Sequence, residues 1–223
     1  TYEHVAPEKV GNRRHIVVSD QAGKSNILAR FGEIGLEIAA DHPKLGRLID
    51  EVKAREHDGF AYDGADASFE LLARRALGSV PEYFTLVSFR VITERRFNAK
   101  GELVTQSEAT VKVDVKGQRV LTVGEGNGPV DALDGALREA LLPVYPRLAD
   151  IRLIDYKVRI LTPEAGTKAV TRVMIESTDG AHRHWSTIGV SANVIDASYN
   201  ALHDSITWFL FHEERVASEK AAD

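Results

Sequence analysis

The sequence predicts an α+β fold, with a small, mainly helical subdomain over residues 1–80 and a pseudo-twofold domain of two β-β-β-α repeats over residues 81–217. Two observations predict this arrangement. Near Pro81 the spacing of the apolar residues changes from a helical period to the alternation typical of half-buried strands. After Pro81 the chain also repeats its own pattern at a fixed distance. Residues 218–223 are expected to form a disordered tail.

The front part of the chain predicts one strand and three helices. A β-branched run over residues 14–19 is typical of a strand. Residues 25–41, 42–59 and 66–78 then show helical spacing. Gly32 and Gly35 interrupt the first of these patterns, and Gly59 ends the second.

The repeat becomes visible when the chain is shifted by 65 residues, because Gly124 then falls on Gly189. The same shift aligns further identical pairs, which are Asp131 with Asp196, Ala132 with Ala197, Ala136 with Ala201 and Leu137 with Leu202. In the first copy, strands are predicted over residues 83–97, 108–115 and 118–124; in the second, a strand over 151–161 precedes a hairpin at 172–189. The repeats therefore span about 83–145 and 150–215.

Each repeat ends in an amphipathic helix whose start is marked by an asparagine. Asn127 or Gly128 caps the first helix, Pro129 lies in the first turn, where no backbone donor is needed, and Pro143 ends it. Asn193 caps the second helix. The helix of such a unit covers only one face of its sheet, so two units that face each other bury the remaining apolar surface. This pattern favours a pseudo-twofold domain and a homodimer.

The composition narrows the classes of partner. The chain has no cysteine, which excludes disulfides, thiolate nucleophiles and cysteine-ligated metals, and which fits the cytoplasm. A formal charge of -5 with interspersed signs gives no long-range attraction for nucleic acid or for anionic lipid. No apolar run approaches the length of a membrane span. We therefore expect small molecules and proteins as partners, with no nucleic acid and no membrane.

The glycine-rich stretch that starts at Gly124 does not fit a phosphate-binding loop. Counted from Gly124, the third glycine of a dinucleotide fingerprint would stand where Pro129 is, and antiparallel hairpins surround the stretch. Asp131 in the first helical turn would repel a phosphate. Residues 22–26 end like a P-loop, but Val18 stands where that motif needs a glycine. Neither stretch predicts a nucleotide site.

Two groups that contain histidine were considered as a metal site and as a catalytic site, and neither interpretation is favoured. His182 and His184 share one strand face at a spacing that a metal can use, but no acidic partner completes the site, so an exposed hairpin is the preferred interpretation. His203, Asp204 and Ser205 have the residue types of a hydrolytic trio. Neighbouring helix residues do not face one another, so we interpret these three as a solvated helix face.

Four segments together resemble a known family. The stretch "GEGNGPVDALDGAL", the preceding "VKVDVKGQRVLTV", and the following "IDYKVRIL" and "STIGVSANVIDASYNAL" are similar to the C-terminal regulatory domain of the 2-isopropylmalate synthase and citramalate synthase family, over about residues 83–212. The first 27 residues resemble the linker subdomain of the citramalate-type branch. Isopropylmalate-type members tend to have a lysine-histidine-serine-glycine turn where this chain has Asp20, Gln21 and Ala22. The resemblance therefore favours the citramalate-type branch.

The resemblance implies a larger enzyme. Family members carry an N-terminal TIM barrel that holds a divalent metal and condenses acetyl-CoA with a 2-oxo acid. This chain contains none of that barrel, so by resemblance it has no cofactor of its own and is inactive alone. Tyr2 and His4 are candidate catalytic residues in the full-length enzyme, with a plain linker role as the alternative.

The resemblance also implies a feedback site. In this family the domain is a homodimer that binds a branched-chain amino acid, isoleucine or leucine, and inhibits the distant barrel. The effector-binding residues implied here are Gly126, Asn127, Gly128, Pro129, Val130, Asp131, Leu153, Tyr156, Ile160, Val170, Ala192 and Val194. The glycines would let the loop change shape when the ligand arrives. Two alternatives stay open: core packing for the apolar members, and a purely structural dimerisation module without an effector.

Overall fold

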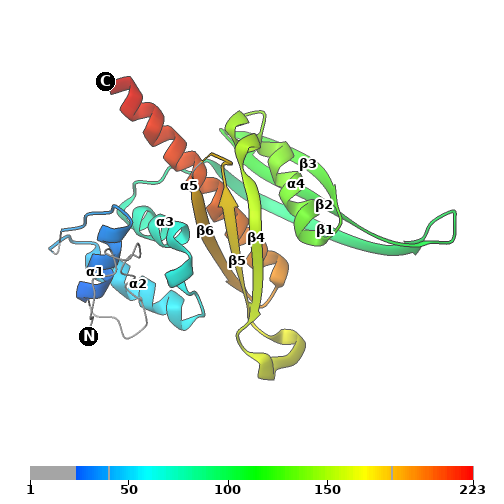
Figure 1. The fold of residues 1–223 in the computed structure, drawn as a ribbon, viewed down its shortest axis with the longest axis horizontal. Coiled ribbons are helices and arrows are strands. Elements are labelled where there is room, and N and C mark those ends of the chain that lie inside the picture. Colours follow the sequence, from blue (N-terminus) through cyan, green and yellow to red (C-terminus); the bar gives the residue numbers. More distant parts are fainter. Residues whose placement is uncertain (1–23, 40, 182, 223) are drawn as a thin grey trace.

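The computed structural model describes residues 24–39, 41–181 and 183–222. Its first part contains helices α1 (Lys24–Glu33), α2 (Leu45–His57) and α3 (Asp66–Leu77), with a 3-10 turn η2 (Tyr62–Gly64) before α3 (Figure 1). The three predicted helices are therefore confirmed. The first is shorter than predicted, because the chain leaves the helix after Glu33 and turns through Gly35 at a φ of 70°. The predicted strand at 14–19 lies outside the described residues, as do Tyr2 and His4.

Two β-β-β-α units follow, as the repeat predicts. The first consists of β1 (Phe84–Phe97), β2 (Leu103–Val115), β3 (Gln118–Gly126) and α4 (Pro129–Leu141). The second consists of β4 (Arg152–Ile160), β5 (Thr171–Thr178), β6 (His184–Ser191) and α5 (Val194–Ala222), with 3-10 turns η3 (Pro146–Asp150) and η4 (Pro163–Lys168). Each unit forms its own antiparallel sheet, in the orders β1-β2-β3 and β4-β5-β6. The α+β fold class is confirmed.

The two units repeat each other in detail. The register shifts between Leu86 and Ser88 on β1, and the same irregularity occurs between Leu153 and Asp155 on β4. Such a β-bulge leaves one residue unpaired and bends the strand. Because the bulge recurs at the same place in both outer strands, the repeat extends beyond the identities visible in the sequence.

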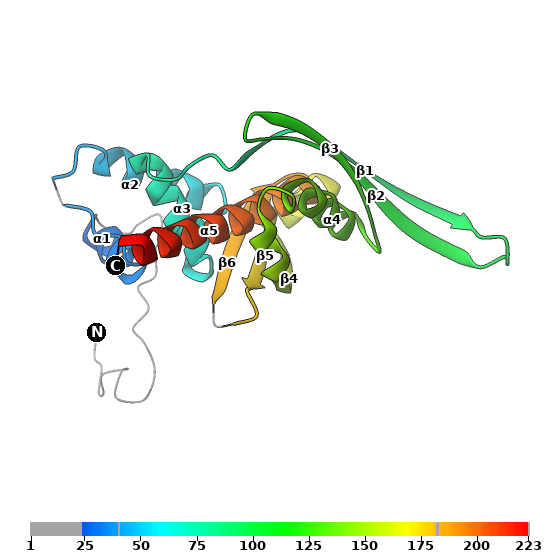
Figure 2. The same cartoon turned by 90° about the horizontal axis from the view of Figure 1, so that it is seen from above.

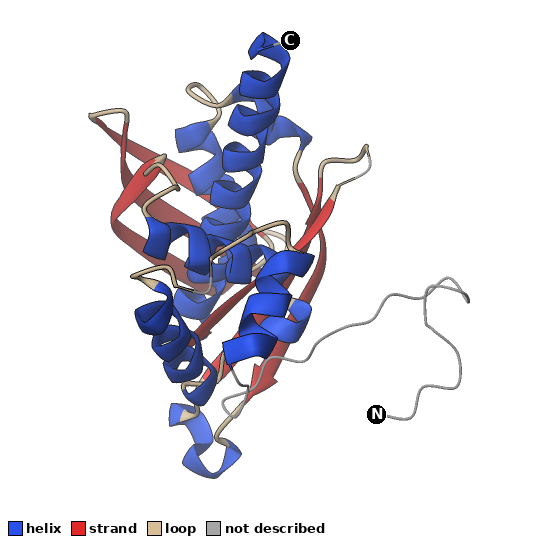
Figure 3. Ribbon diagram, turned by 90° about the vertical axis from the view of Figure 1, so that its left-hand side faces the viewer, coloured by secondary structure: helices blue, strands red, loops and turns tan. Residues whose placement is uncertain are grey.

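The helices α4 and α5 lie between the two sheets (Figure 3). Helix α4 packs on β2 and β3, helix α5 packs on β5 and β6, and the helices contact each other. The shared core consists of inward residues from both units, among them Val111, Val113, Leu133, Leu137, Val173, Ile175, Leu202 and Phe209. The units are therefore two halves of one domain.

The helical subdomain has a second core and is tied to the second unit. Its buried residues include Phe31, Leu48, Tyr62 and Phe69, and this cluster extends to Ile188 on β6. The carboxylate of Glu70 on α3 accepts hydrogen bonds from Arg74 Nε at 2.6 Å and from Trp208 Nε1 of α5 at 2.7 Å.

Asp204 makes a second connection between α5 and α3. It accepts hydrogen bonds from Ser68 Oγ at 2.8 Å and from Arg75 Nη1 at 2.7 Å, and both donors belong to α3. Burial opposes ionisation of Asp204, but hydrogen bonding to His203 and Ser68 and the charge of Arg75 outweigh it and lower the pKa of this carboxyl.

Two elements extend further than the sequence predicts. Helix α5 continues to Ala222, so residues 218–222 of the predicted disordered tail are helical, since this run is rich in helix formers and has neither glycine nor proline. Strand β2 begins at Leu103 rather than at residue 108, and together with β1 it forms a ribbon that projects from the body (Figure 2). Residues 103–107 do not show an alternating pattern, since the apolar Leu103 and Val104 are adjacent and three polar residues follow, and the extension was therefore not predicted.

Candidate functional site

Four of the predicted effector residues line one cavity between the two units. The cavity has a volume of about 240 Å³ and is bounded by Val130 and Asp131 at the start of α4 and by Leu153 and Tyr156 on β4. Asp134, one helical turn beyond Asp131, completes the wall. The start of the first unit's helix and the outer strand of the second unit's sheet thus meet at a single hollow.

The start of α4 is held in place by its caps. Gly128 is the N-cap residue with extended backbone angles, and Pro129 occupies the first turn, as predicted. The backbone N–H of Asn127 donates to Asp131 Oδ2 at 2.9 Å. One carboxylate oxygen of Asp131 is therefore engaged by the loop that precedes the helix.

Two glycines of this stretch, Gly124 and Gly126, allow close packing against α4, and the expectation that the loop changes shape when a ligand arrives stays a prediction. A Cβ on Gly126 would lie 2.5 Å from the backbone nitrogen of Ala132. A Cβ on Gly124 would lie 2.4 Å from the backbone nitrogen of Ala136. No real Cβ atom approaches backbone so closely, so glycine is required where β3 crosses its helix.

Asp134 is the functional candidate that the sequence reasoning missed. Its Oδ2 accepts a hydrogen bond from Arg138 Nε at 2.7 Å. Among the described residues no donor reaches Oδ1, which is shielded from solvent. A buried carboxylate oxygen without a donor costs about 1–3 kcal/mol or more, because it loses its water without gaining a partner. The signal in the sequence was the spacing of three from Asp131 to Asp134, which places both carboxylates on one face of α4.

Arg138 also fixes α4 relative to the strand across the cavity. Its Nη1 donates to the carbonyl oxygens of Leu148 and Ile151, each at 3.1 Å. Ile151 directly precedes β4, which carries Leu153 and Tyr156. The guanidinium of Arg138 therefore bonds both the Asp134 carboxylate and the segment that leads into β4, on the opposite side of the cavity.

Tyr156 connects the cavity to α5. Its Oη lies 2.7 Å from Ser198 Oγ, and Ser198 Oγ in turn donates to the carbonyl oxygen of Val194 at 2.6 Å. Because the serine proton is engaged by Val194, the tyrosine hydroxyl is the donor to Ser198. A change in the position of the Tyr156 ring would act directly on the helix that contacts α3.

The other eight predicted effector residues do not line this cavity. Four of them, Gly126, Asn127, Gly128 and Pro129, directly precede Val130 in the chain, and the other four lie elsewhere. Ile160 is exposed at the far end of β4, and Val170 precedes β5, where its N–H donates to Thr162 Oγ1 at 2.8 Å. Ala192 is exposed between β6 and α5, and Val194 is the first residue of α5. The described cavity therefore brings together Val130, Asp131, Leu153 and Tyr156 but not these four.

The position that the pseudo-twofold relates to this cavity lies between α5 and β1, and side chains fill it. The 65-residue shift carries Asp134 onto Tyr199, and the strand registers place Tyr156 on Phe89. The Phe89 and Tyr199 rings pack with their centroids 5.7 Å apart. Burial raises the pKa of the Tyr199 hydroxyl well above its usual value, so this site contains a neutral ring where the first has a carboxylate.

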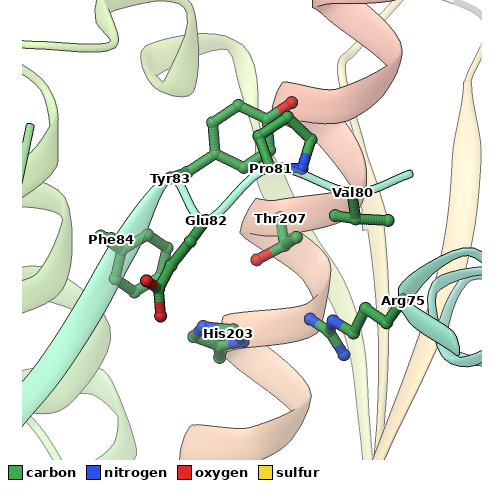
Figure 4. A pocket seen from close by; sticks show the side chains of 8 residues that line it. All are labelled: Arg75, Val80, Pro81, Glu82, Tyr83, Phe84, His203 and Thr207. Atoms are coloured by element: carbon green, nitrogen blue, oxygen red, sulfur yellow. The ribbon is translucent and has the colours of Figure 1, made fainter. Parts of the chain in front are cut away.

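A second hollow, of about 200 Å³, lies where the helical subdomain joins the repeats (Figure 4). It is lined by Arg75 of α3, by the connecting residues 80–84, and by His203 and Thr207 of α5. The charge of Arg75 is already engaged by Asp204. The predicted effector residues do not line this hollow.

The histidine interpretations have different outcomes. His184 Nδ1 lies 3.6 Å from Glu176 Oε1, and His182 lies outside the described residues. The prediction that His203, Asp204 and Ser205 form a solvated face is wrong. Ser205 is buried and accepts a hydrogen bond from Trp185 Nε1 at 2.9 Å, and Asp204 bonds α3. Helix α5 contacts α3, α4 and its own sheet, so more than one face of this helix is buried.

Within the described ranges, no group of three or more histidine, aspartate or glutamate side chains is arranged to hold a metal ion. The described helices also include none that is both long and apolar enough to cross a membrane.

The fold and the sequence together define the family. Residues 63–210 match the family model of the LeuA allosteric (dimerisation) domain. The chain therefore belongs to this family, the C-terminal regulatory domain of citramalate and 2-isopropylmalate synthases. The match supports self-association, and it begins ahead of α3, so the family's domain includes that helix.

Curated relatives agree with this assignment. The chain is 49% identical over 214 residues to an (R)-citramalate synthase of Aquifex aeolicus, covering 96% of this chain and 40% of the relative. It is 46% identical over 220 residues to an (R)-citramalate synthase of Geobacter sulfurreducens, covering 99% of this chain and 41% of the relative. A probable 2-isopropylmalate synthase of Methanopyrus kandleri is 29% identical over 204 residues, which cover 90% of this chain and 38% of that relative. The chain thus spans about two fifths of the relatives it matches.

Proposed function

We propose that this chain is the feedback-regulatory part of a cytoplasmic citramalate synthase, and that the cavity between α4 and β4 binds isoleucine or leucine. In the full-length enzyme, an acyltransferase, a metal-containing barrel would condense acetyl-CoA with a 2-oxo acid, and the bound amino acid would inhibit that step. The observation that carries the proposal is the cavity itself, which Asp131 and Asp134 line together with the apolar side chains of Val130 and Leu153.

The walls match the three chemical parts of such an amino acid. The carboxylates of Asp131 and Asp134 suit an ammonium group, which supplies hydrogen-bond donors and a positive charge. The first backbone N–H groups of α4 suit a carboxylate, because they have no partner within the helix. Val130 and Leu153 suit a branched apolar tail. The cavity volume of about 240 Å³ is below the range of about 300–1,000 Å³ for pockets that hold drug-sized ligands, which fits a ligand as small as an amino acid.

Calorimetric titration of the chain with isoleucine and with leucine tests the proposal. We expect one of the two to bind, and Asp134→Asn and Asp131→Asn each to weaken binding by at least about tenfold, since a charge-assisted hydrogen bond is worth about 1.5–3 kcal/mol. Asp196→Asn is the matched control, because Asp196 is the counterpart of Asp131 in the second unit and is exposed. Its affinity should equal that of the unaltered chain.

The alternative of a purely structural dimerisation module predicts a different result. Neither amino acid would release heat or raise the unfolding temperature, and all three variants would behave alike. Unaltered affinity in Asp134→Asn would show instead that an amino acid binds at another place.

A further inference from the structure

The hollow at the junction of the helical subdomain and the repeats is separate from the cavity between α4 and β4 (Figure 4). The connecting segment that forms one of its walls is fixed at Tyr83. Its Oη donates to Glu214 Oε2 at 2.7 Å, and its carbonyl oxygen accepts a hydrogen bond from Tyr145 Oη at 2.9 Å. Tyr83 and Phe84 are also buried. The shape of this wall is therefore set by the fold itself.

Thr207 on α5 presents a hydroxyl to this hollow that the fold does not use. Only 4% of the Thr207 surface is exposed, and Figure 4 shows its hydroxyl turned toward Glu82 and His203. Two serines of the same helix, Ser198 and Ser218, donate to the carbonyl oxygen four residues earlier, at 2.6 and 2.8 Å. Thr207 Oγ1 has no such bond, and no other described residue is its partner. Buried hydroxyls in proteins nearly always have a partner, so this one is available to a molecule in the hollow.

Arg75 on α3 also has hydrogen-bond donors that the fold leaves unused. A guanidinium has five N–H donors. Nη1 of Arg75 donates to Asp204 Oδ1 at 2.7 Å, and no other group among the described residues accepts a hydrogen bond from this side chain. Ser68 and His203 also stabilise Asp204, so this carboxylate does not depend on Arg75 alone. Figure 4 shows the guanidinium pointing across the hollow toward His203. The remaining N–H groups of such a planar fork match the two oxygens of a carboxylate.

We propose that this hollow binds a small monocarboxylic acid in its ionised form, with the carboxylate held by Arg75 and Thr207 and the apolar part against Val80 and Pro81. The hollow has a volume of about 200 Å³, equal to that of about six or seven water molecules at about 30 Å³ each, so the acid is small. Glu82, which lines the hollow and is exposed, opposes a second negative charge and so favours one carboxylate over two.

The bound acid would connect two parts of the molecule. Arg75 belongs to α3 of the helical subdomain, and Thr207 belongs to α5 of the second unit. A ligand that bonds both side chains stabilises the contact between these helices, because it binds the folded chain and not the unfolded one. This inference does not depend on the amino-acid site between α4 and β4, since the two share no lining residue.

Nuclear magnetic resonance titration of the chain with acetate, at constant ionic strength, tests the site. Acetamide is the neutral counterpart of similar shape, and we expect it to bind at least about tenfold more weakly. Thr207→Val should raise the dissociation constant of acetate by at least about tenfold, because it removes a hydrogen bond to a charged group. Thr85→Val is the matched control, since Thr85 is exposed on β1 and does not line the hollow, and it should bind acetate like the unaltered chain. Equal affinities for acetate and acetamide, or an unchanged constant in Thr207→Val, would overturn the proposal.

Two further measurements separate ligand binding from an effect on the fold. Valine keeps the shape of threonine, and the Thr207 hydroxyl has no partner in the described part of the chain. Thr207→Val should therefore unfold at the same temperature as the unaltered chain, or higher, when no acetate is added. Glu82→Gln should bind acetate at least about twofold more tightly, because it removes a like charge. A lower unfolding temperature in Thr207→Val, or weaker acetate binding in Glu82→Gln, would contradict the assigned roles and overturn the site.

Discussion

The two repeats share one backbone plan and differ at the place where each helix start faces the outer strand of the other unit. Both have a bulge in the outer strand, a glycine where the last strand crosses the helix, and a threonine that bonds the helix. Where α5 faces β1, the Phe89 and Tyr199 rings fill the interface. Where α4 faces β4, Tyr156 and Asp134 leave a cavity.

This difference teaches which positions each half of the domain is free to change. The residues that set the distance between strand and helix are the same in both units, because altering them would move the backbone. The residues that fill the interface differ, and one set makes a closed core while the other makes a candidate binding site.

The largest expected effect comes from the shared glycines. A Cβ at Gly189 would lie 2.0 Å from the carbonyl oxygen of Ala197, and one at Gly124 2.6 Å from that of Ala132. We expect Gly189→Ala and Gly124→Ala each to lower the free energy of unfolding by at least about 3 kcal/mol, with the larger loss at Gly189, because the backbone must move. Urea denaturation measures both. Gly135→Ala on α4, whose added methyl group meets only one atom at 3.9 Å, is the control and should not destabilise.

The second prediction concerns the contact between α5 of the second unit and the helical subdomain. Burial opposes ionisation of Glu70, but hydrogen bonds from His212, Arg74 and Trp208 outweigh it and lower its pKa to about 2. Glu70→Gln should reduce the free energy of unfolding by about 1–3 kcal/mol at neutral pH, because it disrupts a buried network.

The same carboxyl predicts a pH dependence. Its native pKa of about 2 lies below the ordinary value of 4.5, so the ionised form stabilises the fold above about pH 4.5. That contribution should be lost as the pH falls from about 4.5 to about 2. Thermal unfolding followed over this range should show a shallower decline for Glu70→Gln than for the unaltered chain. Parallel curves would contradict the assigned role of Glu70.

A smaller effect separates the two threonines. Thr187 Oγ1 donates to the carbonyl oxygen of Ala201 at 2.8 Å in a fully buried position, and Thr122 Oγ1 donates to that of Ala136 at 2.7 Å in a partly exposed one. Replacing either with valine removes one hydrogen bond and should cost about 0.5–1.5 kcal/mol, with the larger cost at Thr187. Equal costs, measured by chemical denaturation, would mean that burial does not distinguish the two bonds.

Much of the fold could be predicted from the sequence, because the repeat and the helix starts are visible as local patterns of residues. The 65-residue identities predicted both units, and Gly128 with Pro129 predicted the start of α4. Asn193 predicted the start of α5 and accepts a hydrogen bond from the Ile195 N–H at 2.9 Å.

What could not be predicted depends on contacts between distant segments. The burial of Asp204 and Ser205 follows from α3 packing against α5, which no local pattern records. Asp134 was missed because only the meeting of α4 with β4 leaves its carboxylate without a second donor. The start of β2 at Leu103 was missed because its first two residues are both apolar and the next three are polar, so they show no alternation.

The most direct test of the central claim is the stoichiometry of amino-acid binding. If only the interface of Asp134 and Tyr156 is open and the interface of Tyr199 and Phe89 is closed, saturating calorimetric titration should give one isoleucine or leucine per chain. The heat should fall sharply in Asp134→Asn at the same ligand concentrations. Two molecules per chain, or no heat with either amino acid, would contradict the account.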